Sequence, residues 1–541
     1  MIEAFTAEDV RAAEQPLLAA ERGFGGGLMH RAATAVEVAV RGELRRRRGV
    51  VPGSVVVGLI GPGNNGGDTL HALARLARHG VRAIALLTAK PHDGGLAALV
   101  SAHGRVAGLV ADLPGEPPPA DPVALCLGAD VLLDGLLGIG GRGGLRGAAA
   151  ELIAALSDDL PRAGGNAPLI IAVDSPSGIG VDDGGVTGPV LRADRTVTFG
   201  VAKPGLLLPP AADLAGRLTV VDLGLRPVLA DQARTPAVSR LTRDDVAALW
   251  PVPGPTDHKY TRGVVGLVAG TTAFPGAAVL SAGGALGAGA GMVRHVGPDP
   301  ARRAVLAAHP EVVTGSSVDV QVQAWVVGPG VGDDDEQAAR ARDALDNALE
   351  AGIPAVVDAG GLEVLPEHLA PHVVLTPHAG ELSRLLGARG IDAGRAEIEA
   401  APLRWAREAA AVTGATILLK GHTTVVVGHG EAAADVVFAQ RDAPAWLAAA
   451  GAGDVLAGLL GALLAARADE VRDGLAAELA AAATLVSGLA ARAANPGGPL
   501  TAGGVARALP RTIAALLAGE PPRGAARRIH IHRATRRVVS R

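Results

Sequence analysis

Short runs of β-branched and apolar residues alternate with amphipathic helical segments along most of this chain. In the first half we predict strands at Ser54–Ile60, Arg82–Leu87, Asp130–Asp134, Leu169–Asp174, Arg195–Phe199 and Leu218–Asp222. In the second half they include Val264–Val268, Val322–Val327, Ala355–Asp358, Val373–Leu375, Thr416–Lys420 and Thr423–Val427. Such alternation is typical of parallel sheets covered by helices, so the pattern predicts an α/β fold in both halves.

The composition narrows the class of protein further. A chain of 541 residues is too long for one hydrophobic core, so we expect at least two domains. The net charge of −4 disfavours a nucleic-acid surface, and the single cysteine, Cys126, excludes a disulfide framework or a cysteine-built zinc site. No cationic leader opens the chain, and no uninterrupted apolar span reaches the ~20 residues of a membrane helix. We therefore expect a cytoplasmic protein that binds neither nucleic acid nor membrane.

The segment between the two halves is rich in proline and charge, with one short helical pattern around Asp244–Trp250. We place the boundary near residue 230, which gives a first domain at residues 1–230 and a second at residues 236–520. Residues 521–541 contain seven arginines and little apolar content, so we expect a flexible basic tail there.

The segment Leu447–Asp454 reads LAAAGAGD and runs directly into an apolar helical stretch. Glycines 451 and 453 allow a sharp turn before this helix, whose first N–H groups then converge on a site suited to a phosphate. Asp454 lies at the mouth of that site, where a carboxylate can take the proton of an attacking hydroxyl. An isolated GxGD segment is more often only a turn with a capping aspartate. The neighbouring motifs favour phosphoryl transfer.

Two other turns in the second half carry polar groups. Lys420 ends a predicted strand, Gly421 allows a turn, and the polar residues that follow are His422, Thr423 and Thr424. A lysine at this place can neutralise phosphate charge. His378 follows Thr376-Pro377 and precedes a helix, so it either caps the helix or binds a ligand. We expect His378, Lys420 and Asp454 to line one shared cleft.

The first half places polar residues at the ends of three strands. The strand Ser54–Ile60 runs into GPGNNGGD (Gly61–Asp68), with a helix predicted from near Thr69. Asp134 ends another strand, and Asp174 ends a third with Ser177 just beyond. Ligands of open parallel sheets bind outside the carboxyl ends of the strands. The oxygens of Asn65, Asp134, Asp174 and Ser177 are those that a hard monovalent cation requires. Alternatively, Asn64 and Asn65 only supply left-handed turn geometry.

Together, GPGNNGGD, DGLLGIGGRGG, VDSPSG and TVTFGVAKPGL resemble the YjeF N-terminal domain, the NAD(P)H-hydrate epimerase family, over roughly Met1–Asp222. The resemblance implies a Rossmann-like three-layer α/β/α domain. It also implies that the hydrated nicotinamide nucleotide contacts Asn64, Asn65, Gly66, Gly67, Asp68, Gly138, Ile139, Gly140, Gly141, Arg142, Gly143, Gly144 and Asp174. A potassium ion (K⁺) would bind Asn65, Asp134 and Ser177. Asp174 is the candidate acid–base catalyst, supported by Lys203.

In the second half, WVVGPGVG, VLTPHAGELSRLLG, ILLKGHTTVVV and AGAGDVLAG resemble the ADP/ATP-dependent NAD(P)H-hydrate dehydratase over roughly Thr242–Ala518. This resemblance implies a ribokinase-like α/β domain. The residues expected to contact the hydrated nucleotide are Ala277, Gly330, His378 and Asp454. Those expected to contact ADP or ATP, with Mg²⁺, are Lys420, Gly421, His422, Thr423, Thr424 and Gly453. Asp454 would activate the C6 hydroxyl for phosphorylation, after which phosphate leaves.

The resemblances predict a fused repair enzyme that epimerises hydrated NADH and NADPH (NADHX and NADPHX) and dehydrates one epimer, as a homo-oligomer. One alternative is that the second half is a small-molecule kinase whose product keeps its phosphate. Another is that the first half is a non-catalytic nucleotide-binding scaffold, although a scaffold has no need for Asp134, Asp174 and Ser177 together.

The chain departs from the family patterns at several places. It reads DAGGLE (Asp358–Glu363) where the dehydratase family reads DADALN, and DAPAWLAAAGAGD where the family reads GNPGMATAGTGD. In the first half the departures are Thr69, Ser175 and Arg142. The carboxylate Asp454 and the glycine turn before it are retained, so we expect the chemistry to be retained as well.

Overall fold

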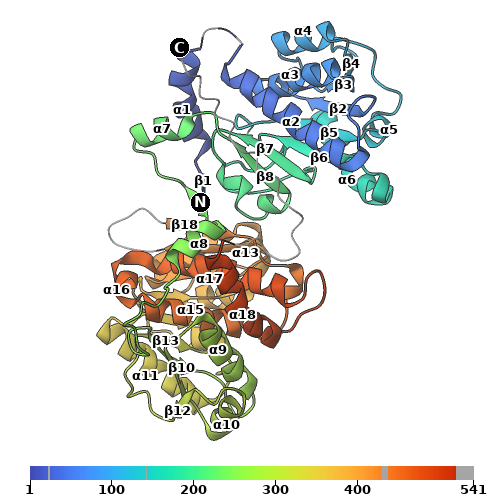
Figure 1. Ribbon diagram of the computed structural model, residues 1–541. Helices are drawn as coiled ribbons and strands as arrows, with labels where there is room; N and C mark the ends of the chain where they lie inside the picture. Colours follow the sequence, from blue (N-terminus) through green and yellow to red (C-terminus); the bar gives the residue numbers. More distant parts are fainter. Residues whose placement is uncertain (22, 24, 142, 429–435, 520–541) are drawn as a thin grey trace. The chain divides into compact units, whose positions relative to one another are not determined.

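The computed structural model describes residues 1–519 apart from 22, 24, 142 and 429–435 (Figure 1). The chain forms two compact units, and neither is continuous in sequence. The first joins Met1–Leu241 to Pro377–Gln440, and the second joins Thr242–Thr376 to the segment from Arg441 onward. The domain bounds predicted from the sequence, 1–230 and 236–520, stay a prediction. The expected tail, 521–541, lies outside the described residues.

The first unit contains a seven-stranded parallel sheet. In spatial order its strands are β4 (Arg105–Gly108), β3 (Arg82–Leu87), β2 (Val55–Ile60), β5 (Val131–Gly135), β6 (Leu169–Val173), β7 (Arg195–Phe199) and β8 (Arg217–Val221). The strand order changes direction between β2 and β5. This point is where ligands bind in open α/β sheets, at the carboxyl ends of the strands.

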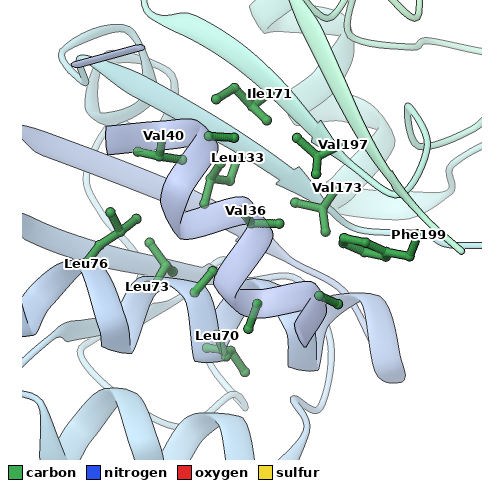
Figure 2. Packing of buried hydrophobic residues seen from close by; sticks show 14 of the residues in the cluster. Val36, Val40, Leu70, Leu73, Leu76, Leu133, Ile171, Val173, Val197 and Phe199 are labelled. Carbon is green, nitrogen blue, oxygen red and sulfur yellow. The ribbon is translucent and has the colours of Figure 1, made fainter. Parts of the chain in front are cut away.

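Helices cover both faces of this sheet. On one face, α2 (Leu28–Arg48) and α3 (Asn64–Arg78) bury their aliphatic residues against the strands. Figure 2 shows Val36 and Val40 of α2 beside Ile171, Val173 and Val197 of the sheet. The other face packs against α5 (Pro122–Leu127) and α6 (Gly147–Ala163). Both the α/β class and the predicted three-layer α/β/α arrangement of the first half are therefore confirmed.

Smaller elements complete the region before residue 242. They are helices α1 (Ala7–Ala19), α4 (Asp93–Ser101) and α7 (Leu225–Asp231), with the short 3₁₀ helices η1 (Gly164–Asn166), η2 (Pro204–Leu206) and η3 (Ala211–Asp213).

Five further strands of the first unit lie in the order β1 (Ile2–Ala4), β9 (Val238–Arg240), β18 (Val436–Gln440), β17 (Thr424–Gly428) and β16 (Thr416–Leu419). The helices beside them are α12 (Ala379–Ala388), α13 (Arg395–Ala400) and α14 (Pro402–Thr413).

The second unit is built on parallel strands throughout. Their order is β15 (Val373–Leu375), β14 (Ala355–Val357), β13 (Ala324–Val327), β10 (Val264–Val268), β11 (Met292–Val296) and β12 (Val313–Gly315). The helices are α8 (Arg243–Leu249), α9 (Pro275–Ala288), α10 (Asp299–Ala308), α11 (Asp335–Ala351), α15 (Ala452–Ala466), α16 (Ala468–Glu470), α17 (Ala476–Ala494) and α18 (Ala502–Leu517). Three short helical turns accompany them: η4 (Ala359–Glu363), η5 (Ala445–Leu447) and η6 (Val471–Leu475).

Strand β13 shows how helices cover both faces of this second sheet. The Trp325 indole donates a hydrogen bond of 3.1 Å to Asn347 of α11. The next side chain, Val326, lies against Gly461 of α15, so closely that a Cβ on Gly461 would be 2.2 Å from it. Because successive side chains of a strand point to opposite faces, α11 and α15 lie on opposite faces of the sheet.

One helical stretch of the second unit, Ala468–Ala494, is long and apolar enough to cross a membrane by length and composition. Most of it is buried within the protein: 83% of its most apolar window is enclosed. It packs against α15 and α18. Its burial is typical of the core helix of a folded domain.

Every strand range predicted from the sequence overlaps a strand of the structure, and the helix near Asp244–Trp250 is α8. The strands that the sequence pattern did not predict are β1, β4, β9, β11, β12 and β18. Three of these, β1, β9 and β12, have only three residues each, and β11 (MVRHV) contains two polar residues. Such strands form through pairing with their neighbours, which local composition does not encode.

Candidate functional site

The glycine loop after β2 forms the first turn of helix α3. We predicted the helix from near Thr69, and this is corrected: α3 begins at Asn64, because Gly63, with φ of 86°, completes the turn before it. A Cβ on Gly66 would lie 2.2 Å from the Gly61 carbonyl oxygen, so only glycine fits there. The early start buries Asn65 and Asp68 while Asn64 stays exposed.

Asn65, Asp134 and Ser177 meet at the switch point between β2 and β5. The Ser177 hydroxyl donates to Asp134 Oδ1 at 2.5 Å, and its backbone N–H donates to Oδ2 at 2.8 Å. Asn65 Nδ2 donates to the Leu137 carbonyl at 3.0 Å, and this carbonyl also lies 3.4 Å from Ser177 Oγ. Burial raises the pKa of the Asp134 carboxyl, although the hydrogen bonds from Ser177 oppose this.

This oxygen cluster fits a hard monovalent cation. Asn65 Oδ1 is buried and has no hydrogen-bond partner among the residues that the structure describes. Buried polar atoms are rarely left unpaired in native proteins. A cation would supply the missing interaction and would also offset the buried charge of Asp134. The choice of K⁺ stays a prediction.

Asp174 and Lys203 form a buried ion pair at the end of β6. Lys203 Nζ lies 2.5 Å from Asp174 Oδ1 and also donates to Thr198 Oγ1 (2.9 Å) and the Phe199 carbonyl (3.1 Å). Oδ1 accepts two more hydrogen bonds, from the Thr198 hydroxyl at 3.1 Å and the Phe199 N–H at 3.2 Å. The hydrogen bonds that the Asp174 carboxylate makes with the described residues all end on Oδ1. This arrangement fixes the carboxylate through one oxygen.

The backbone of Asp174 is in the left-handed region, with φ of 65°. Such a conformation is uncommon for a residue with a side chain and costs on the order of 1–2 kcal/mol. Strained residues cluster at functional sites, where the surrounding structure holds them in place. The strain supports the sequence prediction that Asp174 has a chemical role.

Two other carboxyl groups lie in the electrostatic neighbourhood of this pair. Burial, reinforced by the negative charges of Asp174 and Glu14, raises the pKa of the Asp68 carboxyl well above its usual range. Burial also raises the pKa of Glu14 in α1, against the attraction of Lys203. The sequence motifs predict Asp68 as a site residue. They do not predict Glu14, which belongs to no glycine motif.

The glycine loop after β5 borders the same region. A Cβ on Gly138 would lie 3.1 Å from Asn65 Cβ, which brings this loop against the first one. Gly138, Gly141 and Gly143 line one hollow with Ser175 and Gly178. The structure thus brings both predicted glycine loops together. Ile139, Gly140 and Gly144 belong to the same loop, and Arg142 lies outside the described residues.

In the second unit, Gly451 has φ of 84° and precedes the first residue of helix α15. A Cβ on Gly451 would lie 2.4 Å from Leu280 of α9 and 3.7 Å from Asp454 Oδ2. Gly453 lies inside the first turn, not in the turn before the helix as predicted. Residues 451–454 are half-buried, so the acid and the helix start are reachable from solvent. The first N–H groups of a helix have no acceptor inside it and can hold an anion.

Ala277 and Gly330 lie side by side in the second unit. A Cβ on Gly330 would lie 2.5 Å from the Ala277 methyl group and 3.1 Å from the Phe274 carbonyl. Gly330 has φ of 66°. These residues follow β13 and begin α9, so the structure places both predicted contacts at the carboxyl edge of this sheet.

The altered DAGGLE segment packs tightly onto the loop after β13. A Cβ on Gly328 would lie 2.0 Å from the Asp358 carbonyl oxygen, and one on Gly361 would lie 2.8 Å from the Val327 carbonyl. The Thr376 hydroxyl donates to the buried Asp358 at 2.8 Å. Glycine at position 361 therefore has a packing reason.

His378 and Lys420 are neighbours in the first unit. His378 caps helix α12 by accepting the N–H groups of Gly380 (3.0 Å) and Glu381 (3.1 Å) on Nδ1. The Lys420 N–H donates to the Pro377 carbonyl, and its ammonium lies 3.6 Å from Glu381. Capping, one of the two roles considered for His378, is confirmed. The cleft shared with Asp454 stays a prediction because Asp454 belongs to the other unit.

The turn after Lys420 joins β16 to β17. Gly421 begins it, and Thr424 is the first residue of β17. The Thr423 hydroxyl is buried and has no hydrogen-bond partner within the described part of the chain. His422 lies 3.5 Å from Asp213 of η3. Their assignment to nucleotide binding stays a prediction.

Sequence comparison with known proteins tests the two family resemblances independently of the site geometry. The profile of a family described as NAD(P)H-hydrate dehydratase matches residues 265–502, and that of the YjeF-related protein N-terminus matches residues 25–205. A bifunctional NAD(P)H-hydrate repair enzyme of Mycobacterium tuberculosis is 42% identical over 472 residues, covering 85% of this chain and 89% of the relative. The chain belongs to the bifunctional NAD(P)H-hydrate repair enzymes. The resemblance drawn from the motifs is thereby confirmed for both halves.

A relative from another bacterium and a solved structure are also similar to this chain. A bifunctional NAD(P)H-hydrate repair enzyme of Escherichia coli K12 is 33% identical, covering 78% of this chain and 80% of the relative. Among solved structures, the ADP/ATP-dependent NAD(P)H-hydrate dehydratase of Bacillus subtilis, co-crystallised with ATP and Mg²⁺, aligns at 25% identity with a TM-score of 0.44. It covers 52% of this chain and 99% of that chain.

Proposed function

We propose that this repair enzyme epimerises hydrated NADH and NADPH in its first half and dehydrates one epimer in its second half, using ADP or ATP. The observation that carries the proposal is the pairing of two different acids in one chain. Asp174 is buried, strained and held by Lys203, whereas Asp454 lies half-exposed at a glycine-framed helix start. The first suits proton transfer and the second suits phosphoryl transfer.

For epimerisation, Asp174 is the acid–base residue. The Lys203 ammonium pairs with its carboxylate and orients it through Oδ1, which leaves Oδ2 for the substrate. General acid–base catalysis of this kind contributes about 10²–10⁴ in rate. The two glycine loops, Asn64–Asp68 and Gly138–Gly144, allow the nucleotide to approach the backbone. K⁺ held by Asn65, Asp134 and Ser177 would supply a fixed positive charge beside these loops.

For dehydration, Asp454 takes the proton of the C6 hydroxyl as this oxygen attacks the terminal phosphoryl group. The N–H groups at the start of α15, including that of Gly453, stabilise the developing negative charge. Ala277, Gly330 and His378 contact the hydrated nucleotide. Lys420, with Gly421, His422, Thr423 and Thr424, contacts the ADP or ATP. Mg²⁺ would neutralise part of the phosphate charge.

The test is a turnover assay on an epimer mixture of hydrated NADH, with ATP or ADP and Mg²⁺. The wild-type enzyme should restore the absorbance of NADH from both epimers and release one phosphate per NADH. The Asp174→Asn variant should stop once the dehydratable epimer is consumed, apart from slow spontaneous exchange. A stable phosphorylated product would instead support the small-molecule kinase. Full conversion by Asp174→Asn would overturn the role of Asp174.

The proposal extends to the state of the protein in the cell. We infer a cytoplasmic homo-oligomer with an epimerase domain at residues 1–230 and a dehydratase domain at residues 236–520. Light scattering of the purified protein tests the oligomer. Separate expression of the two ranges tests the domain bounds through the activity that each fragment retains.

A further inference from the structure

The N-terminal segment of the chain is attached to two loops of the first-unit site. The Phe5 N–H donates to the Ala202 carbonyl, next to Lys203, at 3.0 Å. The Ala7 N–H, at the start of helix α1, donates to Asp182 Oδ1 at 2.7 Å. Asp182 lies in the connection that follows β6. The start of α1 is therefore fixed to the lysine segment and to the loop after β6.

The rest of α1 is also fixed within the first unit. Val10 and Ala13 are fully buried in the hydrophobic core that α2 and α3 share with the sheet. On another side of the helix, Asp9 forms an ion pair with Arg234, 3.1 Å apart. A helix held by its first turn, by its buried face and by an ion pair can serve as a fixed support for a neighbouring loop.

Arg11 joins α1 to the second glycine loop. Its guanidinium donates a hydrogen bond of 2.5 Å to the Ile139 carbonyl. Hydrogen bonds from a charged donor are roughly twice as strong as those between neutral groups. The Ile139 side chain packs against the same hydrophobic core as α1, whereas Arg11 is exposed. The loop is thus held through its backbone by Arg11 and through its side chain by the core.

The beginning of this loop is fixed by other residues. The Leu137 carbonyl accepts a hydrogen bond from Asn65 at 3.0 Å, and the Leu137 N–H donates to Ser177 Oγ at 2.9 Å. These two contacts join the loop to the predicted cation site. They end at Leu137, so they do not determine the backbone of the glycines that follow.

The middle of the loop, residues 138–141, has few restraints of its own. Gly141 donates to the Gly138 carbonyl at 3.0 Å, which is a bond within the loop. A Cβ on Gly140 would meet no atom within 4 Å, so this residue has open space around it. Within the described part of the chain, the hydrogen bond from Arg11 is the one that ties the backbone of residues 138–141 to another element.

We propose that Arg11 is a positioning residue of the epimerase site, which holds the second glycine loop in the conformation that binds the hydrated nucleotide. The inference rests on the proposed epimerase function. A glycine-rich loop has many accessible backbone conformations, and fixing one of them before binding lowers the entropy lost on binding. Arg11 also lies outside the part of the chain that the family profile matches, which begins at residue 25.

The contact predicts an effect on binding more than on the chemical step. Arg11 bonds to the loop expected to hold the nucleotide, whereas the hydrogen bonds of Asp174 come from Lys203, Thr198 and Phe199. Loss of the Arg11 side chain leaves those bonds in place. The KM of epimer exchange should therefore change, and kcat should change little.

The first test measures epimer exchange by the full-length enzyme, starting from one purified epimer of hydrated NADH without ADP or ATP. Arg11→Met removes the donors and keeps an unbranched apolar stem. Its KM should rise about tenfold, which corresponds to about 1.4 kcal/mol, with kcat within about twofold of wild type. Arg11→Lys keeps a charged donor. Because the native contact is a single hydrogen bond, lysine should restore KM to within about threefold of wild type.

The second test does not depend on activity. Hydrogen exchange of the backbone amides of residues 136–141, measured on the enzyme without nucleotide, should be faster in Arg11→Met than in wild type. Arg11→Lys should be close to wild type. Arg47→Met is a matched control, because Arg47 is also exposed and donates to a backbone carbonyl, that of Ala167, at 3.5 Å. Ala167 precedes β6, at the opposite end of this strand from Asp174, so the control should change neither KM nor loop exchange.

An unchanged KM in Arg11→Met would overturn the proposal, as would an equal rise in Arg47→Met or a lysine variant as impaired as Arg11→Met. A raised KM with unchanged loop exchange would show that Arg11 acts on the nucleotide directly, which also overturns the positioning role. If Arg11→Met does not fold, Arg11→Gln decides the matter through the same two measurements. A wild-type enzyme without epimer exchange would contradict the proposed function, and loop exchange would still test the role of Arg11.

Discussion

The two candidate sites of this enzyme differ in the kind of chemical group that forms them. The first is made of side chains: Asp174 and Lys203 form a buried ion pair, with the carboxyl groups of Asp68 and Glu14 in its electrostatic neighbourhood. The second is made mainly of backbone: Gly451 shapes the start of α15, and Asp454 is the charged group at its half-exposed mouth. The groups in each site suit the reaction proposed for it: side chains suit proton transfer, and backbone N–H groups suit phosphoryl transfer.

The difference follows from what each reaction must stabilise. Proton transfer requires carboxyl groups whose protonation states are set apart, and this requires burial and charged neighbours. Phosphoryl transfer requires donors that already point at the developing charge, and a helix start supplies them without any side chain. The first site should therefore be sensitive to charge, and the second to backbone geometry.

Asp454→Asn should have the largest effect. It removes the proton acceptor for the attacking hydroxyl, so dehydration should fall by about 10²–10⁴-fold. Epimer exchange should stay at the wild-type rate, because no residue of the first site is changed. The rates of NADH recovery and of epimer exchange, measured on the same preparation, check both statements. Comparable losses in both activities would contradict the separation of the two sites.

Lys203→Met should destabilise the first site, because it removes the positive charge of a buried ion pair. It leaves the buried Asp174 carboxylate without its cation, and breaking a buried ion pair in this way costs about 3–5 kcal/mol. Urea unfolding monitored by circular dichroism measures the loss. The double variant Lys203→Met with Asp174→Asn removes the stranded charge and should recover part of the stability. No recovery would show that the lysine acts through packing alone.

Gly451→Ala should distort the second site, because it changes the backbone geometry at the start of helix α15. The φ of 84° is unfavourable for alanine, and the new methyl group would lie 2.4 Å from Leu280, so we expect a loss of about 1–3 kcal/mol. The dehydration rate should also fall as the start of helix α15 is distorted, while epimer exchange continues. Gly387→Ala is a matched control, because this glycine lies within helix α12 with open space around it. That control should keep both activities.

Asp68→Asn should give the smallest effect on stability, with a size that depends on pH. The folded-state pKa of Asp68 is raised above its ordinary value of 3.8, so its contribution to stability is full below that pH. It is lost as the pH rises through the folded-state pKa. The variant should therefore melt at a higher temperature than wild type at pH 8 and at a similar temperature near pH 4. A variant less stable at pH 8 would contradict this prediction.

The features that could be predicted from the sequence are those that local chemistry dictates. Gly451 and Asp454 were identified because a turn, a helix start and an acid are adjacent in the chain. Asp174 was identified because it ends a strand, although its left-handed backbone was not foreseen. The start of α3 at Asn64 was missed because a run of glycines does not show which of them, here Gly63, completes the turn before the helix.

Glu14 could not be predicted in the same way. It lies 160 residues from Asp174 in sequence, on a helix whose position depends on hydrogen bonds to Ala202, Asp182 and Ile139. The short strands β1 and β9 were missed for a related reason, since each is defined only by its partner. The sequence thus predicts residues next to a motif better than those brought to it by folding.

The first compact unit draws on two separated stretches of chain, Met1–Leu241 and Pro377–Gln440. Strand β9 pairs with β1 from the extreme N-terminus and with β18 from far downstream. A gene cut once near codon 230 would thus separate β1 from β9, which stays in the second fragment with β18. Recombinant work on either activity should begin with the whole reading frame.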